Sequence, residues 1–132
     1  MSKPNSSDRL YSKDHEWVQS QADGSAVVGI TDYAQEMLTD IVFVELPDVG
    51  RVVAKGEAMA VVESVKSVSD VYAPLGGEII DVNRALEDKP ELINSDAFGE
   101  GWIAKIQPAD PEEMAALLSA VDYDALIQQE KH

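Results

Sequence analysis

Lys66 is the residue of this sequence whose position offers the clearest opportunity for chemistry. It is the single lysine between Gly56 and Asp88, and two β-rich runs, residues 58–64 and 68–73, lie on either side of it. A hairpin with a lysine at its tip extends the amine into solvent while the paired strands fix its base, which suits acylation by an enzyme. On position alone, a solvated turn lysine without a specific role is the more frequent case, so the rest of the sequence has to decide.

Short strand-forming segments separated by turn signals surround Lys66. Residues 26–30 follow the turn signal Asp23-Gly24, and residues 41–46 are β-branched and aromatic and stop at Pro47. Short strands at this spacing predict a mainly β protein, built as a β-sandwich or flattened barrel. The same pattern predicts further strands at residues 11–18, 51–54, 58–64, 68–72, 77–83 and 102–106.

Two regions carry helix signals instead. Asp32 precedes residues 33–38, and Gln35 stands at the reciprocal capping-box position, which predicts a short internal helix of about two turns. Asp110 as N-cap, followed by Pro111 and by Glu113 at the capping-box position, opens a helix near the end of the chain. A further short helix after Asp122 is predicted to cover part of the sandwich together with it. The predicted apolar positions are Met114, Leu117, Leu118 and Val121 in the first C-terminal helix and Tyr123, Leu126 and Ile127 in the second.

The composition excludes several classes of function. The 25 acidic side chains outnumber the 10 basic ones, the formal net charge is −15 and no basic patch stands apart, so a nucleic acid would be repelled. Cysteine is absent, which excludes disulfides, thiolate metal sites and a cysteine nucleophile. His15 and His132 are the only histidines, and no third ligand is spaced to form a metal site with them.

The length of 132 residues suits one domain. We expect residues 1–8 to form a flexible N-terminus and residues 9–132 to form a single domain that includes the C-terminal helices. No apolar run approaches the roughly 18 residues of a membrane-spanning helix, and residues 1–7 lack the apolar stretch of a secretory signal. These features predict a cytoplasmic bacterial protein, and the lack of a coiled-coil seam predicts a monomer.

Residues 63–74, Glu-Ser-Val-Lys-Ser-Val-Ser-Asp-Val-Tyr-Ala-Pro, closely resemble the lipoylation segment of glycine cleavage H proteins. Together with other blocks, the resemblance covers about residues 9–127 and is highly specific. Two departures stand out: Thr39 occupies a position where the family has glycine, and Leu75-Gly76-Gly77 replaces a small or polar residue followed by glycine. If the backbone at Thr39 has a positive φ, threonine is strained there. The other blocks similar to the family lie at residues 11–18, 29–35, 40–47, 86–96 and 99–102.

The resemblance implies the lipoyl- and biotinyl-carrier type of β-sandwich, with lipoic acid joined to the Lys66 amine in amide linkage. It also implies a role for the polar residues that flank this lysine. Glu63, Ser67 and Asp70 are expected to be read by the lipoylating enzyme or to contact the lipoyl arm, with Glu63 the strongest candidate.

The resemblance further implies a carrier that performs no catalysis itself. Such a carrier takes the aminomethyl group of glycine from the pyridoxal phosphate-dependent glycine decarboxylase (P protein) to the tetrahydrofolate-dependent aminomethyltransferase (T protein). It then presents the dithiol to dihydrolipoamide dehydrogenase (L protein). The expected partners are these three enzymes and a lipoylating enzyme, with no nucleic acid and no membrane.

Other carriers and a non-carrier remain as alternatives. Lipoyl domains of 2-oxoacid dehydrogenases and biotin carrier domains use the same kind of hairpin lysine, but Val65-Lys66-Ser67 resembles neither the Asp-Lys-Ala of the former nor the methionine-flanked lysine of the latter. An H-like carrier that serves another lipoyl-dependent reaction or relays lipoate is one alternative. An acidic β interaction module whose lysine is never modified is the other.

Overall fold

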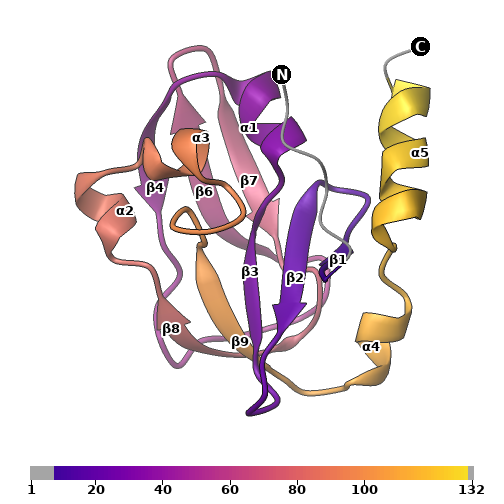
Figure 1. Ribbon diagram of the computed structural model, residues 1–132. Coiled ribbons are helices and arrows are strands. Elements are labelled where there is room, and N and C mark those ends of the chain that lie inside the picture. The colour runs from indigo at the N-terminus through magenta and orange to yellow at the C-terminus, as the bar shows by residue number, and fades with distance from the viewer. Residues whose placement is uncertain (1–7, 131–132) are drawn as a thin grey trace.

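Two antiparallel sheets form the body of the protein in the computed structural model, which describes residues 8–130 (Figure 1). The larger sheet has six strands in the order β1-β2-β3-β9-β8-β5, and the smaller has three in the order β4-β6-β7. The larger sheet consists of β1 (Leu10–Tyr11), β2 (Glu16–Ser20), β3 (Ala26–Ile30), β9 (Ala104–Pro108), β8 (Gly77–Val82) and β5 (Val52–Val53). The smaller sheet consists of β4 (Ile41–Glu45), β6 (Ala58–Ser64) and β7 (Val68–Tyr72).

Both sheets bury their inward side chains in one main core, which confirms the predicted mainly β sandwich. Val62 of β6 and Val71 of β7 lie in the same buried cluster as Val28 of β3, Ile79 of β8 and Ile106 of β9. Fully burying an aliphatic side chain of this size contributes about 1.5–3 kcal/mol. This shared core fixes the sheet that carries Lys66 to the rest of the domain.

The strands predicted at residues 26–30, 58–64 and 68–72 are confirmed. The single strand predicted at residues 11–18 is wrong, because the chain turns back between β1 and β2, which pair antiparallel. The last strand begins at Ala104, two residues later than predicted, and the strand predicted at residues 51–54 is reduced to Val52–Val53.

The internal helix α1 (Asp32–Leu38) is confirmed, but its N-cap is Thr31 rather than Asp32. Thr31 has extended backbone angles, and its Oγ1 accepts a hydrogen bond from the Ala34 N–H over 3.2 Å. Asp32 lies inside the first turn, where its carboxylate accepts a hydrogen bond from the Gln35 side chain over 3.0 Å. Two helices of four residues each, α2 (Ala85–Asp88) and α3 (Leu92–Ser95), follow β8 in a stretch that the sequence pattern leaves without structure.

The C-terminal region forms two helices, but their boundaries differ from the prediction. Helix α4 (Glu112–Ala115) is short and has Pro111 as its N-cap, while the Asp110 carboxylate accepts a hydrogen bond from the Glu112 N–H over 3.0 Å. Glu113 does not complete a capping box, because its Oε1 accepts the N–H of Gly76 over 2.8 Å. The apolar positions predicted for the first C-terminal helix do not form a buried face on one helix. Leu117 and Leu118 follow α4 outside any helix, and Val121 is 77% exposed.

Helix α5 (Ala120–Glu130) stands beside β1 and β2 at one side of the molecule (Figure 1). It begins earlier than predicted and runs longer. Of its predicted apolar positions, Tyr123 and Ile127 are buried in a second cluster with Tyr11 and Trp17, and Leu126 packs against that cluster. The predicted flexible N-terminus falls outside the described residues except for Asp8, and His132 also lies outside them.

Candidate functional site

Lys66 lies at the exposed tip of the hairpin between β6 and β7. The Ser64 N–H donates to the Ser67 carbonyl over 2.8 Å, and the Ser64 hydroxyl oxygen accepts the N–H groups of Lys66 and Ser67 over 3.3 and 3.1 Å. The Val65 N–H donates to the Asp40 carbonyl over 3.0 Å, which ties the tip to the segment before β4. The backbone of the turn is therefore held on both sides while the Lys66 side chain remains accessible.

A cavity of about 340 Å³ lies beside this hairpin tip. The hairpin forms one side of it, α1 forms another, and the turn that leads into β2 forms a third. The lining combines apolar side chains with three carboxyl groups. Its residues are Asp14, His15, Glu16, Ile30, Ala34, Met37, Leu38, Val62, Lys66, Ser67, Ser69, Asp70 and Val71.

The flanking residues singled out in the sequence separate into two groups. Ser67 and Asp70 line the cavity together with Lys66. Glu63 does not line it; this residue pairs with Phe43 of β4 on one side and Val68 of β7 on the other. Phe43 and Val68 are 50% and 66% exposed, so Glu63 lies in a row of side chains that extends across the smaller sheet.

Glu16 is a further candidate that the sequence pattern does not reveal. It is only 2% exposed, its Oε1 accepts a hydrogen bond from the Ser12 hydroxyl over 2.5 Å, and its Oε2 accepts the Tyr72 N–H over 3.3 Å. Burial raises the pKa of the Glu16 carboxyl to about 8, although both hydrogen bonds favour the charged form. A buried carboxyl of this kind at a cavity wall is typical of functional sites. The sequence offers only a charged residue beside Trp17, which is no distinctive signal.

A larger cavity of about 500 Å³ lies on the other side of the same turn. It shares Asp14 and Glu16 with the first cavity, but Lys66 does not line it. Its other boundary is the segment after α4, including Leu117 and Leu118. Of these two cavities, the smaller one is therefore the candidate site, because Lys66 lines it.

The described part of the chain limits other kinds of site. Among residues 8–130, no three His, Cys, Asp or Glu side chains are grouped to hold a metal ion. No helix in that range is both long enough and apolar enough to cross a membrane.

A β-sandwich with an accessible lysine at a hairpin tip is the arrangement found in domains that carry a prosthetic group covalently on lysine. Residues 9–130 match the pattern of the Glycine cleavage H-protein family, and the chain belongs to this family. It is 57% identical over 120 residues to the Glycine cleavage system H protein of Shewanella sp. (strain ANA-3), covering 91% of this chain and 93% of that protein. Its identity to the protein of the same name from Cronobacter sakazakii (strain ATCC BAA-894) is 58% over 120 residues, with the same coverage.

A solved structure agrees with the family assignment. The crystal structure of a glycine cleavage system H protein from Mycobacterium marinum superimposes with a TM-score of 0.84 at 43% sequence identity. The match covers 92% of this chain and 97% of that one. The likeness therefore extends over both sheets and is not confined to the lysine hairpin.

Proposed function

We propose that Lys66 carries the lipoyl group of this chain, which as a member of the glycine cleavage H-protein family is a lipoyl carrier of the glycine cleavage system. The observation that carries the proposal is the position of Lys66, exposed at a hydrogen-bonded hairpin tip and lining a cavity. An acylating enzyme requires access to the amine, and the fixed turn presents it.

The residues around Lys66 fit a lipoyl group. A cavity of about 340 Å³ lies within the size range of small-molecule sites, and its apolar lining suits a hydrocarbon chain. Ile30, Val62 and Val71 supply part of that lining and belong to the main core, so they form a rigid floor. When attached, the lipoyl group supplies the dithiolane that accepts the aminomethyl group derived from glycine. Once that group has been passed on, the remaining dithiol is reoxidised to the dithiolane.

The carboxyl groups of the cavity favour a cationic or amine-bearing end of the arm. Asp14, Glu16 and Asp70 all line the cavity. Because the pKa of Glu16 is raised to about 8, its carboxyl retains a proton in much of the neutral pH range and can donate as well as accept a hydrogen bond. The apolar walls reduce the access of water to any group held there.

The remaining functional proposals follow from membership of the glycine cleavage system. The chain acts as a non-catalytic carrier and visits glycine decarboxylase, aminomethyltransferase and dihydrolipoamide dehydrogenase in turn, after a lipoylating enzyme has modified Lys66. We place it in the bacterial cytoplasm as a monomer. We also propose that residues 9–132 form the one domain that performs this carrier role.

Loading by glycine tests this function. Lipoylated protein is incubated with glycine decarboxylase and glycine, and its intact mass is recorded; a parallel sample receives the pyruvate-specific decarboxylase of a 2-oxoacid dehydrogenase with pyruvate. We expect the first sample to gain the mass of glycine less carbon dioxide and the second to remain unchanged. Loading by pyruvate alone would assign the carrier to a different reaction.

A further inference from the structure

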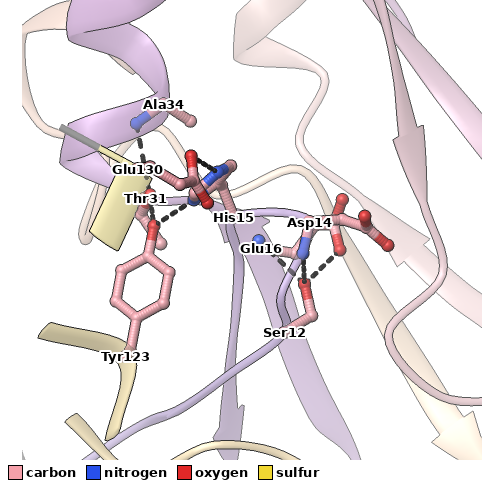
Figure 2. Close-up of polar contacts among 8 residues, drawn as sticks. All are labelled: Ser12, Asp14, His15, Glu16, Thr31, Ala34, Tyr123 and Glu130. Atoms are coloured by element: carbon pink, nitrogen blue, oxygen red, sulfur yellow. Dashed lines mark hydrogen bonds and ion pairs between the residues drawn. The ribbon is translucent and has the colours of Figure 1, made fainter. Parts of the chain in front are cut away.

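Tyr123 of helix α5 points toward His15 and Thr31 (Figure 2), although it does not line the smaller cavity itself. Its hydroxyl oxygen is 2.8 Å from His15 Nδ1 and 2.6 Å from Thr31 Oγ1. The Tyr123 side chain is fully buried. One hydroxyl group of the C-terminal helix thus contacts both the turn before β2 and the start of α1.

Each contact lies next to residues of the cavity wall. His15 stands between Asp14 and Glu16 in the chain, and all three line the cavity. Thr31 is the N-cap of α1, whose residues Ala34, Met37 and Leu38 line it from the other side. A displacement of either His15 or Thr31 would therefore move a wall of the cavity.

The donors and acceptors of this cluster fit a single chain of hydrogen bonds. Thr31 Oγ1 accepts the Ala34 N–H, so its own proton is available to the Tyr123 oxygen. The Tyr123 hydroxyl then donates to His15 Nδ1, and His15 Nε2–H donates to Glu130 Oε1 over 3.1 Å. In this assignment, which rests on the heavy-atom geometry, every donor has an acceptor and His15 carries its proton on Nε2.

The backbone conformation of His15 is one that surrounding contacts must hold in place. Its φ is 71°, in the left-handed region that non-glycine residues adopt only when the surroundings hold them there. The His15 carbonyl accepts the Thr31 N–H over 3.0 Å, so the turn and α1 already touch through their backbones. The Tyr123 hydroxyl adds the side-chain connection that fixes the imidazole.

We propose that Tyr123 is a positioning residue for the arm cavity: from helix α5, its hydroxyl holds the Asp14–Glu16 turn and the start of α1 in the relative positions that shape the cavity. This inference rests on the proposed function, in which the arm on Lys66 uses that cavity. The C-terminal helix is then part of the carrier site although none of its residues lines the cavity.

The first test uses the unmodified chain and the Tyr123→Phe variant. The variant keeps the aromatic ring, which stacks on Tyr11 with centroids 4.8 Å apart, and removes only the hydroxyl. We expect nitrogen NMR to show that His15 loses its preference for the Nε2–H tautomer. We also expect amide hydrogen exchange of residues 14–16 and 32–38 to rise about 2- to 10-fold, which corresponds to the loss of one hydrogen bond.

Ile127→Val is the matched control. Ile127 is buried in the same cluster on the same helix, and shortening it loosens the packing of α5 without removing a hydrogen bond. We expect a lowered melting temperature in this control, with the His15 tautomer and the exchange of the cavity segments unchanged. Unchanged tautomer and exchange in Tyr123→Phe, or equal changes in Ile127→Val, would overturn the proposal.

The second test measures the arm itself on lipoylated protein. We expect dithiothreitol to reduce the dithiolane about 2- to 10-fold faster in Tyr123→Phe than in the parent chain, and at the parent rate in Ile127→Val. Equal rates in all three proteins would overturn the role of Tyr123 in the arm cavity. Failure of Lys66 to accept a lipoyl group is a separate outcome, visible in the intact mass before any reduction, and would contradict the proposed function instead.

Discussion

The backbone N–H of Tyr72 donates a hydrogen bond to Glu16 Oε2 over 3.3 Å, which joins the first residue of β2 to strand β7 of the lysine hairpin. These two residues are 56 positions apart in the sequence and belong to different sheets. Their contact brings a buried carboxyl group to a cavity that Lys66 also lines. The electrostatics of the cavity therefore depend on Glu16 as well as on the residues next to the lysine.

Glu16 gives the stability of the protein a specific pH dependence. The pKa of its carboxyl is raised from 4.5 to about 8 in the folded protein, so between these pH values the folded state retains a proton that the unfolded state has lost. The free energy of unfolding therefore falls as the pH rises from about 4.5 to about 8, and the contribution of Glu16 is fully present only below this window. In Glu16→Gln this contribution to the slope is absent.

We compare the free energy of unfolding of Glu16→Gln with that of the parent chain. We expect the difference to shift in favour of the variant by about 1–4 kcal/mol as the pH rises from about 5 to about 9, since one pKa unit corresponds to about 1.4 kcal/mol. Urea unfolding at a series of pH values measures the difference. Glu78→Gln, an exposed substitution on β8, serves as the control. Its plot of unfolding free energy against pH should run parallel to that of the parent chain. Parallel curves for Glu16→Gln would show that the carboxyl is not held in its neutral form.

Asp70 and Glu63 are expected to affect the carrier in different ways. Asp70 lines the cavity and Glu63 does not, although both flank Lys66 in the sequence. If carboxylates hold the amine end of the loaded arm, Asp70→Asn removes a charge from the cavity and should raise the rate of ammonia release from glycine-loaded protein without tetrahydrofolate by about 2- to 10-fold. Glu63→Gln should leave that rate unchanged. An equal effect of the two substitutions would indicate that the arm lies outside the cavity.

Thr39 is predicted to be a site of avoidable strain. It forms the C-cap of α1 with φ 66° and ψ −147°, a conformation that glycine adopts readily and threonine does not. We expect Thr39→Gly to raise the free energy of unfolding by about 0.5–2 kcal/mol, measured by urea unfolding. Thr39→Ala is the matched control, because it keeps the Cβ and should give no gain. A gain of equal size in both variants would assign the effect to the threonine hydroxyl.

Sequence patterns were informative where one physical signal dominates. Each strand that flanks Lys66 contains two β-branched valines between turn signals, and both strands were predicted with their observed boundaries. A positive φ at Thr39 was expected only from the family resemblance, in which glycine occupies this position, and the observed φ of 66° agrees with it. Side-chain hydrogen bonds were less predictable: Thr31 and Asp32 both suit an N-cap, and only the fold shows which of them accepts the Ala34 N–H.

The wall of the cavity opposite the hairpin was beyond sequence reasoning for a physical reason. Asp14 and His15 belong to a turn, and Glu16 begins β2, inside a segment with strand-like composition. The hydroxyl oxygen of Ser12 closes this turn by accepting the N–H groups of Asp14 and Glu16. Tyr123 reaches the same turn from a position 108 residues further along the chain. Contacts of this range are set by tertiary packing, which no local periodicity records.

The proposed carrier role requires that Lys66 is lipoylated. The parent chain, Lys66→Arg and Lys55→Arg are each incubated with lipoate, ATP and a lipoate ligase, and intact masses are recorded before and after. Lys55 is also exposed but lies outside the hairpin, so it controls for non-specific acylation of lysine. We expect the parent chain and Lys55→Arg each to gain one lipoyl group and Lys66→Arg to gain none. A lipoyl group on Lys66→Arg, or no mass gain in the parent chain, would contradict the assignment of Lys66 as the carrier residue.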